Sequence, residues 1–406
     1  MNEHTTCCVV GGGPAGIMLG YLLARAGVEV VVLEKHKDFF RDFRGDTIHP
    51  STLEVMHELG LLEELLQQPH EELRGVQAHF GERVLHLADF SHLPTRCKFV
   101  AFMPQWDFLS FISRHGQKFP QFRLRMQAEV IDLLFEGGMP EAGRVEGVKA
   151  RTPEGTLDVR AHLVVAADGR GSTVRERAGL EVMDLGAPMD VLWFRILKKA
   201  GDPPQAFGYV GAGQFMVLID RAEYWQCAYV IRKGSLEERQ KRGLDAFREE
   251  VGRCAPFLAD RTREIAEWDD VKLLSVKVDR LRKWCREGLL CIGDAAHAMS
   301  PVGGVGINLA IQDAVAAANL LAPQLLKHDV KLSDLDAVQK RREKPARVTQ
   351  RVQVFLHKHL LEAIFDSQER IAPPGFLRLT ERFPRLREIP GRMVGMGFRP
   401  EHVRLS

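Results

Sequence analysis

Three glycines and one acid near the N-terminus have the spacing of a nucleotide-binding turn. Gly11, Gly13 and Gly16 form a G-x-G-x-x-G pattern directly after the apolar run CCVV, and Glu34 ends the next apolar run. Glycines at this spacing allow a tight turn and let a diphosphate approach the N-terminus of the following helix. The carboxylate of Glu34 can accept hydrogen bonds from a ribose. The pattern therefore predicts a dinucleotide site.

A second glycine-rich run, GDAAHAMSPVGGVGINLA, occupies residues 293–310. A flavin dinucleotide is long enough to need contacts from several separated parts of a chain. Asp294 follows an apolar run and can hydrogen-bond a ribityl or ribose hydroxyl. Gly303, Gly304 and Gly306 precede a helical pattern whose positive N-terminal end would stabilise negative charge on a reduced flavin. The two runs are expected to form two walls of one flavin site.

His297, inside this run, allows two interpretations. An imidazole can shuttle protons near neutral pH, which suggests catalysis. The alternative is a structural histidine within the flavin-binding turn, and this is the interpretation we favour.

The elements that must position these residues can be read from apolar periodicity. Residues 5–35 read as strand, tight turn, helix and strand. A capping box from Ser51 to Glu54 predicts the start of a second helix, and a third helix is expected from Pro104. Hairpin strands are expected over residues 123–135 and 144–159, before an apolar strand over residues 163–168.

Residues 189–279 have a different pattern, with short, aromatic-rich, alternating runs typical of an antiparallel sheet. In the run YWQCAYVIR, alternation places Trp225 and Tyr229 on one face and Tyr224 and Gln226 on the other. We expect the second face to cover the flavin and to offer polar groups to a substrate ring, with Trp193 and Arg195 on a neighbouring strand. Ordinary packing within the sheet remains an alternative for each of these residues.

Composition excludes several other classes. The 406 residues carry a formal net charge of only +2, which gives no electrostatic case for nucleic-acid binding. The seven cysteines show neither a C-x-x-C pair nor metal-ligand spacing, so we expect no metal and a reducing, cytoplasmic setting. No bilayer-spanning segment is expected. The arginine-rich tail from Pro373 is interpreted as a packed segment or a homodimer contact in preference to a membrane contact.

Three motifs together carry a resemblance to a known family. The turn at 11–16 with Glu34, the run DGRGSTVR at 168–175 and the run GDAAHAMSPVGGVGIN at 293–308 occur in the same order in the para-hydroxybenzoate hydroxylase family, the class A FAD-dependent monooxygenases. The resemblance implies an α/β fold with a Rossmann-like FAD-binding domain of the glutathione-reductase/hydroxybenzoate-hydroxylase type, an inserted antiparallel β-sheet substrate domain and a helical C-terminal region. The expected FAD-binding segments are 1–74, 98–180 and 280–345, the substrate segments 75–97 and 181–279, and the C-terminal region 346–406.

The resemblance also implies which residues contact FAD. Arg44 is expected near the diphosphate, Gln105 near the ribityl chain and the backbone of Ile307 and Asn308 at the pyrimidine edge. Pro301 would line the flavin ring, and together with Gln226 it is a candidate catalytic residue. The complete expected FAD set is Gly11, Gly13, Ala15, Gly16, Glu34, Lys35, Arg44, Gln105, Asp168, Asp294, Pro301, Gly303, Gly304, Gly306, Ile307 and Asn308.

The implied reaction is hydroxylation of an aromatic or polycyclic small molecule. In the family, NADPH or NADH reduces FAD, and the reduced flavin reacts with O2 to give a C4a-hydroperoxide that delivers a hydroxyl group. Because the sequence holds no second G-x-G-x-x-G unit, the pyridine nucleotide would bind transiently, as a co-substrate. The basic residues around Lys35 and Arg44 favour NADPH, although a solvated loop would look the same.

Other reactions remain open on the sequence. The same scaffold can serve a dehydrogenase or reductase of an isoprenoid or other lipophilic substrate, or a flavin-binding protein without turnover. A flavin halogenase is disfavoured because its W-x-W-x-I-P signature is absent. The tyrosine, serine and arginine set that binds hydroxybenzoate is not matched, so a simple benzoate substrate is in doubt.

Overall fold

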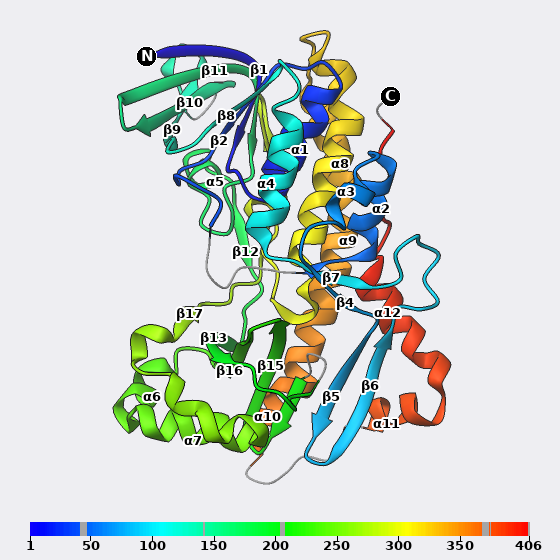
Figure 1. Cartoon of the computed structure of the whole chain (residues 1–406). Helices are drawn as coiled ribbons and strands as arrows, with labels where there is room; N and C mark the ends of the chain where they lie inside the picture. Colours follow the sequence, from blue (N-terminus) through cyan, green and yellow to red (C-terminus); the bar gives the residue numbers. More distant parts are fainter. Residues whose placement is uncertain (41–46, 141–142, 204–207, 368–372, 374, 405–406) are drawn as a thin grey trace.

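The computed structural model describes residues 1–40, 47–140, 143–203, 208–367, 373 and 375–404. An eight-stranded sheet contains the βαβ unit predicted from the N-terminal sequence (Figure 1). In it β1 lies between β11 and β2 and is parallel to both, while β8 extends the parallel part beyond β2 and β20 beyond β11. The strands are β1 (Asn2–Val10), β2 (Val30–Leu33), β8 (Phe122–Arg125), β9 (Glu129–Phe135), β10 (Val145–Thr152), β11 (Gly155–Ala166), β19 (Cys285–Arg286) and β20 (Leu289–Cys291).

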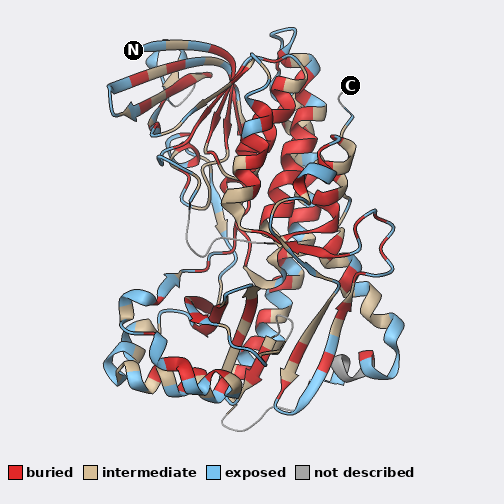
Figure 2. Ribbon diagram, in the orientation of Figure 1, coloured by how far each residue is buried: buried red, intermediate tan, exposed pale blue. Residues whose placement is uncertain are grey.

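Four helices pack beside this sheet, and two of them form much of the core. The helices are α1 (Pro14–Arg25), α4 (Gln105–Gly116), α8 (Gly306–Leu325) and α9 (Leu332–Leu356). Figure 2 shows α1 and α8 almost wholly buried, as expected of helices that are apolar on nearly every face. The segment Val302–Leu325 is the one helix of the described residues long and apolar enough to cross a membrane, and 78% of its apolar window is buried inside the protein.

A seven-stranded sheet lies at the other end of the molecule (Figure 1), with strand order β17-β13-β16-β15-β14-β5-β6. Its pairs are antiparallel, as predicted, except for the parallel pair of β14 and β5. The strands are β5 (Gly75–Phe80), β6 (Arg83–Asp89), β13 (Met189–Leu197), β14 (Gly208–Gly211), β15 (Gln214–Arg221), β16 (Tyr224–Arg232) and β17 (Lys272–Leu274). The domain boundaries expected from the sequence stay predictions.

The two faces of this sheet have different neighbours. Trp225 and Tyr229 face a cluster that includes Phe247 of α7 (Leu244–Cys254), so this face is covered by helices. Ala228 and Val230, on the opposite face, pack with apolar residues from the C-terminal region. The alternation read from the run at 224–232 is therefore confirmed.

The remaining elements connect the two sheets. A small sheet joins β3 (Thr47–Ile48), β7 (Val100–Phe102) and β4 (Glu71–Leu73), and β12 (Val182–Asp184) pairs with β18 (Asp279–Leu281). After α9 the chain continues through a π-helical turn, His357–Leu361, into α10 (Glu362–Asp366). Later come α11 (Gly375–Arg382) and α12 (Glu388–Gly395), and α12 packs against β6 so closely that a Cβ on Gly391 would lie 2.0 Å from the Asp89 carbonyl oxygen.

Two local predictions are wrong. The second helix, α2 (Pro50–Glu58), has His49 as its N-cap, and Ser51 lies inside its first turn. Pro50 begins this helix because proline suits the first helical position, where its missing N–H costs nothing. Residues 123–135 do not form one hairpin strand: Gln127 has a left-handed φ of 55°, and the chain turns there between β8 and β9.

Candidate active site

The carboxyl ends of four parallel strands meet at one edge of the large sheet. Val10 of β1 is in register with Leu33 of β2 and with Ala166 of β11, and Ala166 is in register with Cys291 of β20. The residues that follow these strand ends therefore start from the same edge. They are Gly11, Glu34, Asp168 and Gly293, so the separated motifs of the sequence are brought together.

The glycines of the N-terminal turn have different surroundings. A Cβ on Gly16 would lie 1.9 Å from the Gly11 carbonyl oxygen, and one on Gly11 would lie 2.4 Å from that of Ala167. A Cβ on Gly13 would meet no atom within 4 Å. Gly11 and Gly16 are thus required by packing, whereas Gly13 leaves its side of the turn accessible to a diphosphate. Ala15 is buried beneath them.

Glu34 is buried at the end of β2 and is held by two backbone groups. Its Oε2 accepts a hydrogen bond from the Gly12 nitrogen at 2.9 Å, and its Oε1 accepts one from the His36 nitrogen at 2.9 Å. These bonds fix the carboxylate beside the glycine turn. Lys35 is exposed next to it, and Arg44 lies outside the described residues.

The motif DGRGSTVR at 168–175 supplies Asp168 to the site and Arg175 to the support of the fold. Asp168 Oδ2 accepts from the Val174 nitrogen at 3.2 Å, and burial raises the pKa of Asp168. Its Oδ1 is buried and has no hydrogen-bond partner among the described residues. Arg175, in contrast, points away and donates to both carboxylate oxygens of Asp279 at 3.2 Å. Its role is to hold β18, and Ser172 caps the short helix Thr173–Arg177.

Asp294 lies one residue after a glycine in a left-handed conformation. Gly293 has a left-handed φ of 59°, and its nitrogen donates to Asp313 Oδ2 of α8 at 3.0 Å. This bond directs the chain so that Asp294 leaves the sheet edge half-exposed, with its Oδ2 3.8 Å from an Arg170 guanidinium nitrogen. A carboxylate in this position can accept a hydrogen bond from a sugar or ribityl hydroxyl.

His297 is part of the scaffold of this turn. It is 1% exposed, and its Nε2 lies 2.6 Å from Asp313 Oδ2. The other oxygen of Asp313 accepts from Arg342 of α9 at 2.9 Å. Burial alone would raise the pKa of Asp313, but His297 and Arg342 together hold that pKa below its usual value. This geometry favours the structural interpretation of His297.

The loop before α8 combines glycines in left-handed conformations with a tight anchor. Gly303 and Gly304 have φ values of 81° and 63°, and the Thr47 hydroxyl donates to the Gly304 carbonyl oxygen at 2.9 Å. Pro301 and Gly306 flank this pair and are both half-exposed. The loop is therefore shaped by backbone geometry that side chains with a Cβ rarely adopt.

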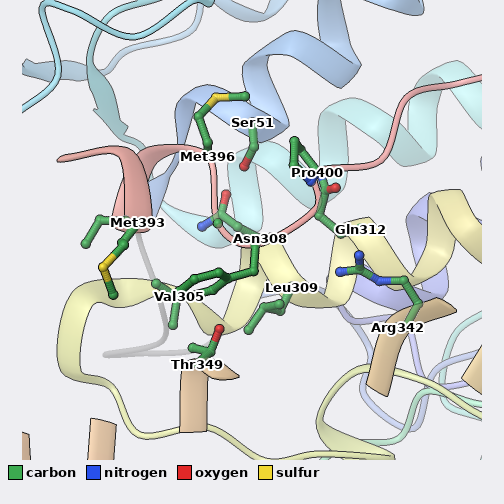
Figure 3. Close-up of a pocket in the computed structure, with 13 residues that line it drawn as sticks. Ser51, Val305, Asn308, Leu309, Gln312, Arg342, Thr349, Met393, Met396 and Pro400 are labelled. Atoms are coloured by element: carbon green, nitrogen blue, oxygen red, sulfur yellow. The ribbon is translucent and has the colours of Figure 1, made fainter. Parts of the chain in front are cut away.

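The side chain of Asn308 is engaged within the protein. Its Oδ1 accepts from the His49 nitrogen at 2.9 Å and from the Thr52 hydroxyl at 2.7 Å. Its backbone nitrogen, with those of Gly306 and Ile307, belongs to the first turn of α8, whose N–H groups have no acceptor within the helix. Figure 3 shows Asn308 facing the C-terminal segment across a cavity of about 20 Å³, room for one water molecule.

The predicted substrate residue, Gln226, lies on the same face of β16 as Ala228 and Val230. Gln226 is 5% exposed, and its Oε1 accepts from Arg221 Nε at 3.3 Å. Arg195, paired with Gln226 across β13 and β16, lies with its guanidinium 5.1 Å from the centre of the Tyr224 ring. Burial raises the pKa of Asp107, which lies with Gln105 in the first turn of α4. The positive charge of Arg221 partly opposes this rise.

The site includes residues that the sequence motifs did not indicate. Asp313 is the one charged residue of α8, a signal that could have revealed it because lone buried charges need partners. Arg221 precedes a turn and carries no such signal. Gln353 and His357 come from α9 and its π-helical turn. They contact Ser300 in the loop of residues 298–305 before α8, which we name the flavin-binding loop, and no local sequence pattern predicts these contacts.

These residues fit FAD in three respects. The turn at Gly13 has room for a diphosphate, and Asp168 presents a buried oxygen that has no partner among the described residues. The first turn of α8 supplies N–H groups and a positive dipole end beside the loop. Together they match the phosphate, sugar and ring portions of the dinucleotide.

Comparison with known proteins gives the same result. A family described as FAD binding domain matches residues 4–352. The 6-methylpretetramide 4-monooxygenase of Streptomyces rimosus is 33% identical over 97% of this chain and 93% of its own length. A 12-dehydrotetracycline 5-monooxygenase/anhydrotetracycline 6-monooxygenase from the same species is 29% identical over 76% of this chain, which spans 60% of that relative.

Solved structures share the fold. PqsL, a probable FAD-dependent monooxygenase from Pseudomonas aeruginosa, has a TM-score of 0.74 at 21% identity and covers 90% of this chain and 100% of its own. The p-nitrophenol 4-monooxygenase PnpA from Pseudomonas putida has a TM-score of 0.75 at 22% identity over 95% of each chain. The predicted fold class and FAD cofactor are confirmed. NAD(P)H is the co-substrate typical of such enzymes. The chain belongs to the FAD-binding-domain family and is an FAD-dependent flavoprotein monooxygenase of class A.

Proposed function

We propose that this monooxygenase hydroxylates an aromatic ring of a polycyclic small molecule, with NADPH or NADH and O2 as co-substrates. One observation carries the proposal: Val302 of the flavin-binding loop packs in the same apolar cluster as Ala228 and Val230, on the face of β16 opposite α7. A flat apolar ring system beside that loop would therefore contact the sheet. The names of relatives that act on methylpretetramide and anhydrotetracycline support a polycyclic substrate.

The polar group at this face would orient the ring. Gln226 and Arg221 form a hydrogen-bonded pair beside Tyr224, and we place a phenolic oxygen of the substrate near this amide and guanidinium. The positive charge of Arg221 favours the ionised phenol, and an ionised phenol makes its ring more electron-rich and more reactive toward an electrophilic oxygen. Pro301 would line the ring of the cofactor, and apolar walls would exclude water from the reacting atoms.

The cofactor would be held by the residues at the sheet edge. Glu34 would bind the adenosine ribose, Gly13 would admit the diphosphate, and Asp294 would bind the ribityl chain. When bound and reduced by NAD(P)H, FAD supplies the activation of O2 and the transfer of one oxygen atom. The first turn of α8 stabilises negative charge on the reduced ring. Gly303 and Gly304 carry no Cβ and would let the ring lie close to the loop backbone.

A reducing, cytoplasmic setting is part of the proposal and is supported by the cysteines. All seven are buried and none forms a disulfide, which agrees with a reducing cytoplasm. Neither a homodimer contact nor a membrane contact is needed by the site described above.

An oxygen-labelling experiment tests the proposed function. The protein is supplied with FAD, NADPH or NADH, and ¹⁸O₂, together with a panel of polycyclic phenols and single-ring phenols. The expected result is a polycyclic product that carries one ¹⁸O atom, formed faster than any single-ring product. Oxidation of NAD(P)H without a labelled product from any compound would contradict the proposal.

A further inference from the structure

Three polar side chains of α9 and its π-helical turn face the flavin-binding loop. Gln350, Gln353 and His357 follow the spacing i, i+3 and i+7, which places them on one side of the helix. They are 1%, 3% and 2% exposed. Gln350 donates to the carbonyl oxygens of Asp279 at 2.7 Å and Ala298 at 3.1 Å. The helix thus contacts the loop along a buried polar strip.

Gln353 brackets the candidate catalytic proline. Its amide oxygen accepts from the Ser300 nitrogen at 3.1 Å, and its amide nitrogen donates to the carbonyl oxygens of Ser300 and Val302, both at 2.9 Å. Pro301 lies between these two residues and has no N–H of its own. One side chain therefore fixes the backbone on both sides of Pro301.

His357 secures the same segment through a side chain. Its Nε2 lies 2.9 Å from the Ser300 hydroxyl oxygen, which also accepts from the Val302 nitrogen at 3.3 Å. Burial lowers the pKa of His357 and so favours the neutral form of the ring. Its Nδ1 is buried and has no hydrogen-bond partner among the described residues. A buried polar atom left without a partner destabilises a fold, and such atoms often mark a functional constraint.

The local helix geometry supports this interpretation. His357 begins a π-helical turn, a rare conformation that occurs frequently at functional sites. The last two residues of that turn, Leu360 and Leu361, pack in the apolar cluster that holds Ala228, Val230 and Val302. The π-helical turn therefore contacts the flavin-binding loop and the proposed substrate face at once.

The two ends of the loop are anchored differently. Residues 300–302 are held by α9 and its π-helical turn, whereas Gly304 is held from the other side by Thr47. Between the two anchors lies Gly303, with its left-handed φ of 81°. A change at the first anchor would move Pro301 while leaving the second in place.

We propose that His357 and Gln353 are positioning residues that fix Ser300, Pro301 and Val302 and so set the position of the flavin ring relative to the substrate face. Neither residue needs to touch the reacting atoms. The catalytic consequence rests on the proposed function, but the effect on bound FAD does not. Loss of the anchor would leave FAD bound and reducible while oxygen transfer loses its alignment with the substrate.

The test compares His357→Leu and Ser300→Ala with a matched control, His359→Leu, which alters an exposed histidine of the same turn. The readouts are the visible spectrum and fluorescence of bound FAD, and the fraction of oxidised NAD(P)H recovered as hydroxylated product. We expect both test variants to shift the FAD spectrum and to lower that fraction roughly threefold to tenfold. The double variant should lose no more than Ser300→Ala alone, because both substitutions remove the contact between His357 and Ser300, and Ser300→Ala also removes the hydrogen bond from Val302. His357→Gln should recover part of the loss, and the control should match the wild type.

The outcomes separate this proposal from the proposed function. If wild-type protein yields no labelled product, the proposed function fails, and the FAD spectra of the variants still decide the positioning role. The positioning role is overturned if Ser300→Ala and His357→Leu both keep the FAD spectrum of the wild type. Where hydroxylated product forms, both variants must also keep the wild-type product fraction for that conclusion. If His357→Leu does not fold, Ser300→Ala decides by the same readouts.

Discussion

The backbone nitrogen of Gly12 donates a hydrogen bond to Oε2 of Glu34 at 2.9 Å. This contact joins the glycine turn after β1 to the acid after β2. It fixes the carboxylate before any ribose arrives, so little conformational entropy remains to be lost on binding.

Replacement of Glu34 by Gln should weaken FAD binding about tenfold, because charge-assisted hydrogen bonds contribute roughly 1.5–3 kcal/mol. Quenching of FAD fluorescence on titration into apoprotein measures the Kd. Glu29→Gln, at an exposed position five residues earlier, is the control and should bind as the wild type does. Equal affinity in Glu34→Gln and the control would remove Glu34 from the site.

Two alanine substitutions in the same turn should have different effects, one on FAD binding and the other on the stability of the fold. Gly13→Ala places its Cβ where no protein atom lies within 4 Å, so we expect normal stability and weaker FAD binding. Gly16→Ala places its Cβ 1.9 Å from the Gly11 carbonyl oxygen, so we expect the free energy of unfolding to fall by about 1–3 kcal/mol. Thermal unfolding of the apoproteins and FAD titration separate the two effects. Normal FAD affinity in Gly13→Ala would contradict the placement of the diphosphate.

Arg342 should contribute more to stability than its neighbour Arg341. Arg342 is 1% exposed and donates to Asp313, so its replacement by Met takes the guanidinium away from a buried carboxylate, at a cost of about 3–5 kcal/mol. Arg341 is more exposed and bonds the buried Glu401, which keeps Arg342 as a second partner, so Arg341→Met should cost less, about 1–3 kcal/mol. Urea unfolding measures both. Equal losses in the free energy of unfolding would mean that the contacts of Asp313 with Gly293, His297 and Arg342 are not a principal source of stability.

His49 should make the fold less stable in mild acid. Burial lowers its pKa from 6.5 to about 4, and its Nδ1 lies 2.7 Å from the Val394 carbonyl oxygen. Between these two pH values the unfolded chain binds a proton that the folded chain does not, so stability falls as pH falls. The loss attributable to His49 is on the order of 3 kcal/mol. Unfolding measured from pH 7 to pH 4 should show a shallower decline in His49→Gln; an unchanged slope would contradict the prediction.

Gln226→Ala should separate substrate binding from cofactor binding. The variant loses one neutral hydrogen-bonding group, so the KM for the aromatic substrate should rise about fivefold while the Kd for FAD stays the same. Steady-state oxidation of NAD(P)H and FAD titration are the two measurements, and Gln117→Ala, at an exposed position, is the control. A changed Kd for FAD with an unchanged KM would move Gln226 from the substrate face to the cofactor site.

The parts of the fold that local pattern determines could be predicted from the sequence. The turn at Gly11, Gly13 and Gly16 has one suitable backbone conformation, and strict alternation in residues 224–232 fixes which side chains share a face. The meeting of Glu34, Asp168 and Asp294 at one sheet edge could be inferred only through the family resemblance. Strand register, which actually brings them together, depends on pairing between residues more than 100 positions apart.

The contacts of the supporting residues could not be predicted because their partners are distant in sequence. Asp313 is identified by contacts with Gly293 and Arg342, and His357 by its contact with Ser300, 57 residues earlier. Ser51 was misassigned as a helix cap because the capping pattern competes with Pro50, whose fixed φ begins the helix one residue sooner.

The most direct test of the FAD site is the stoichiometry and affinity of FAD for apoprotein of the wild type and of Asp294→Ala, with the exposed Asp329→Ala as control. We predict one FAD per chain for all three proteins, with affinity at least about tenfold weaker in Asp294→Ala alone. Wild-type affinity in Asp294→Ala, or no FAD binding by the wild type, would contradict the conclusion that the two distant glycine-rich runs form one flavin site.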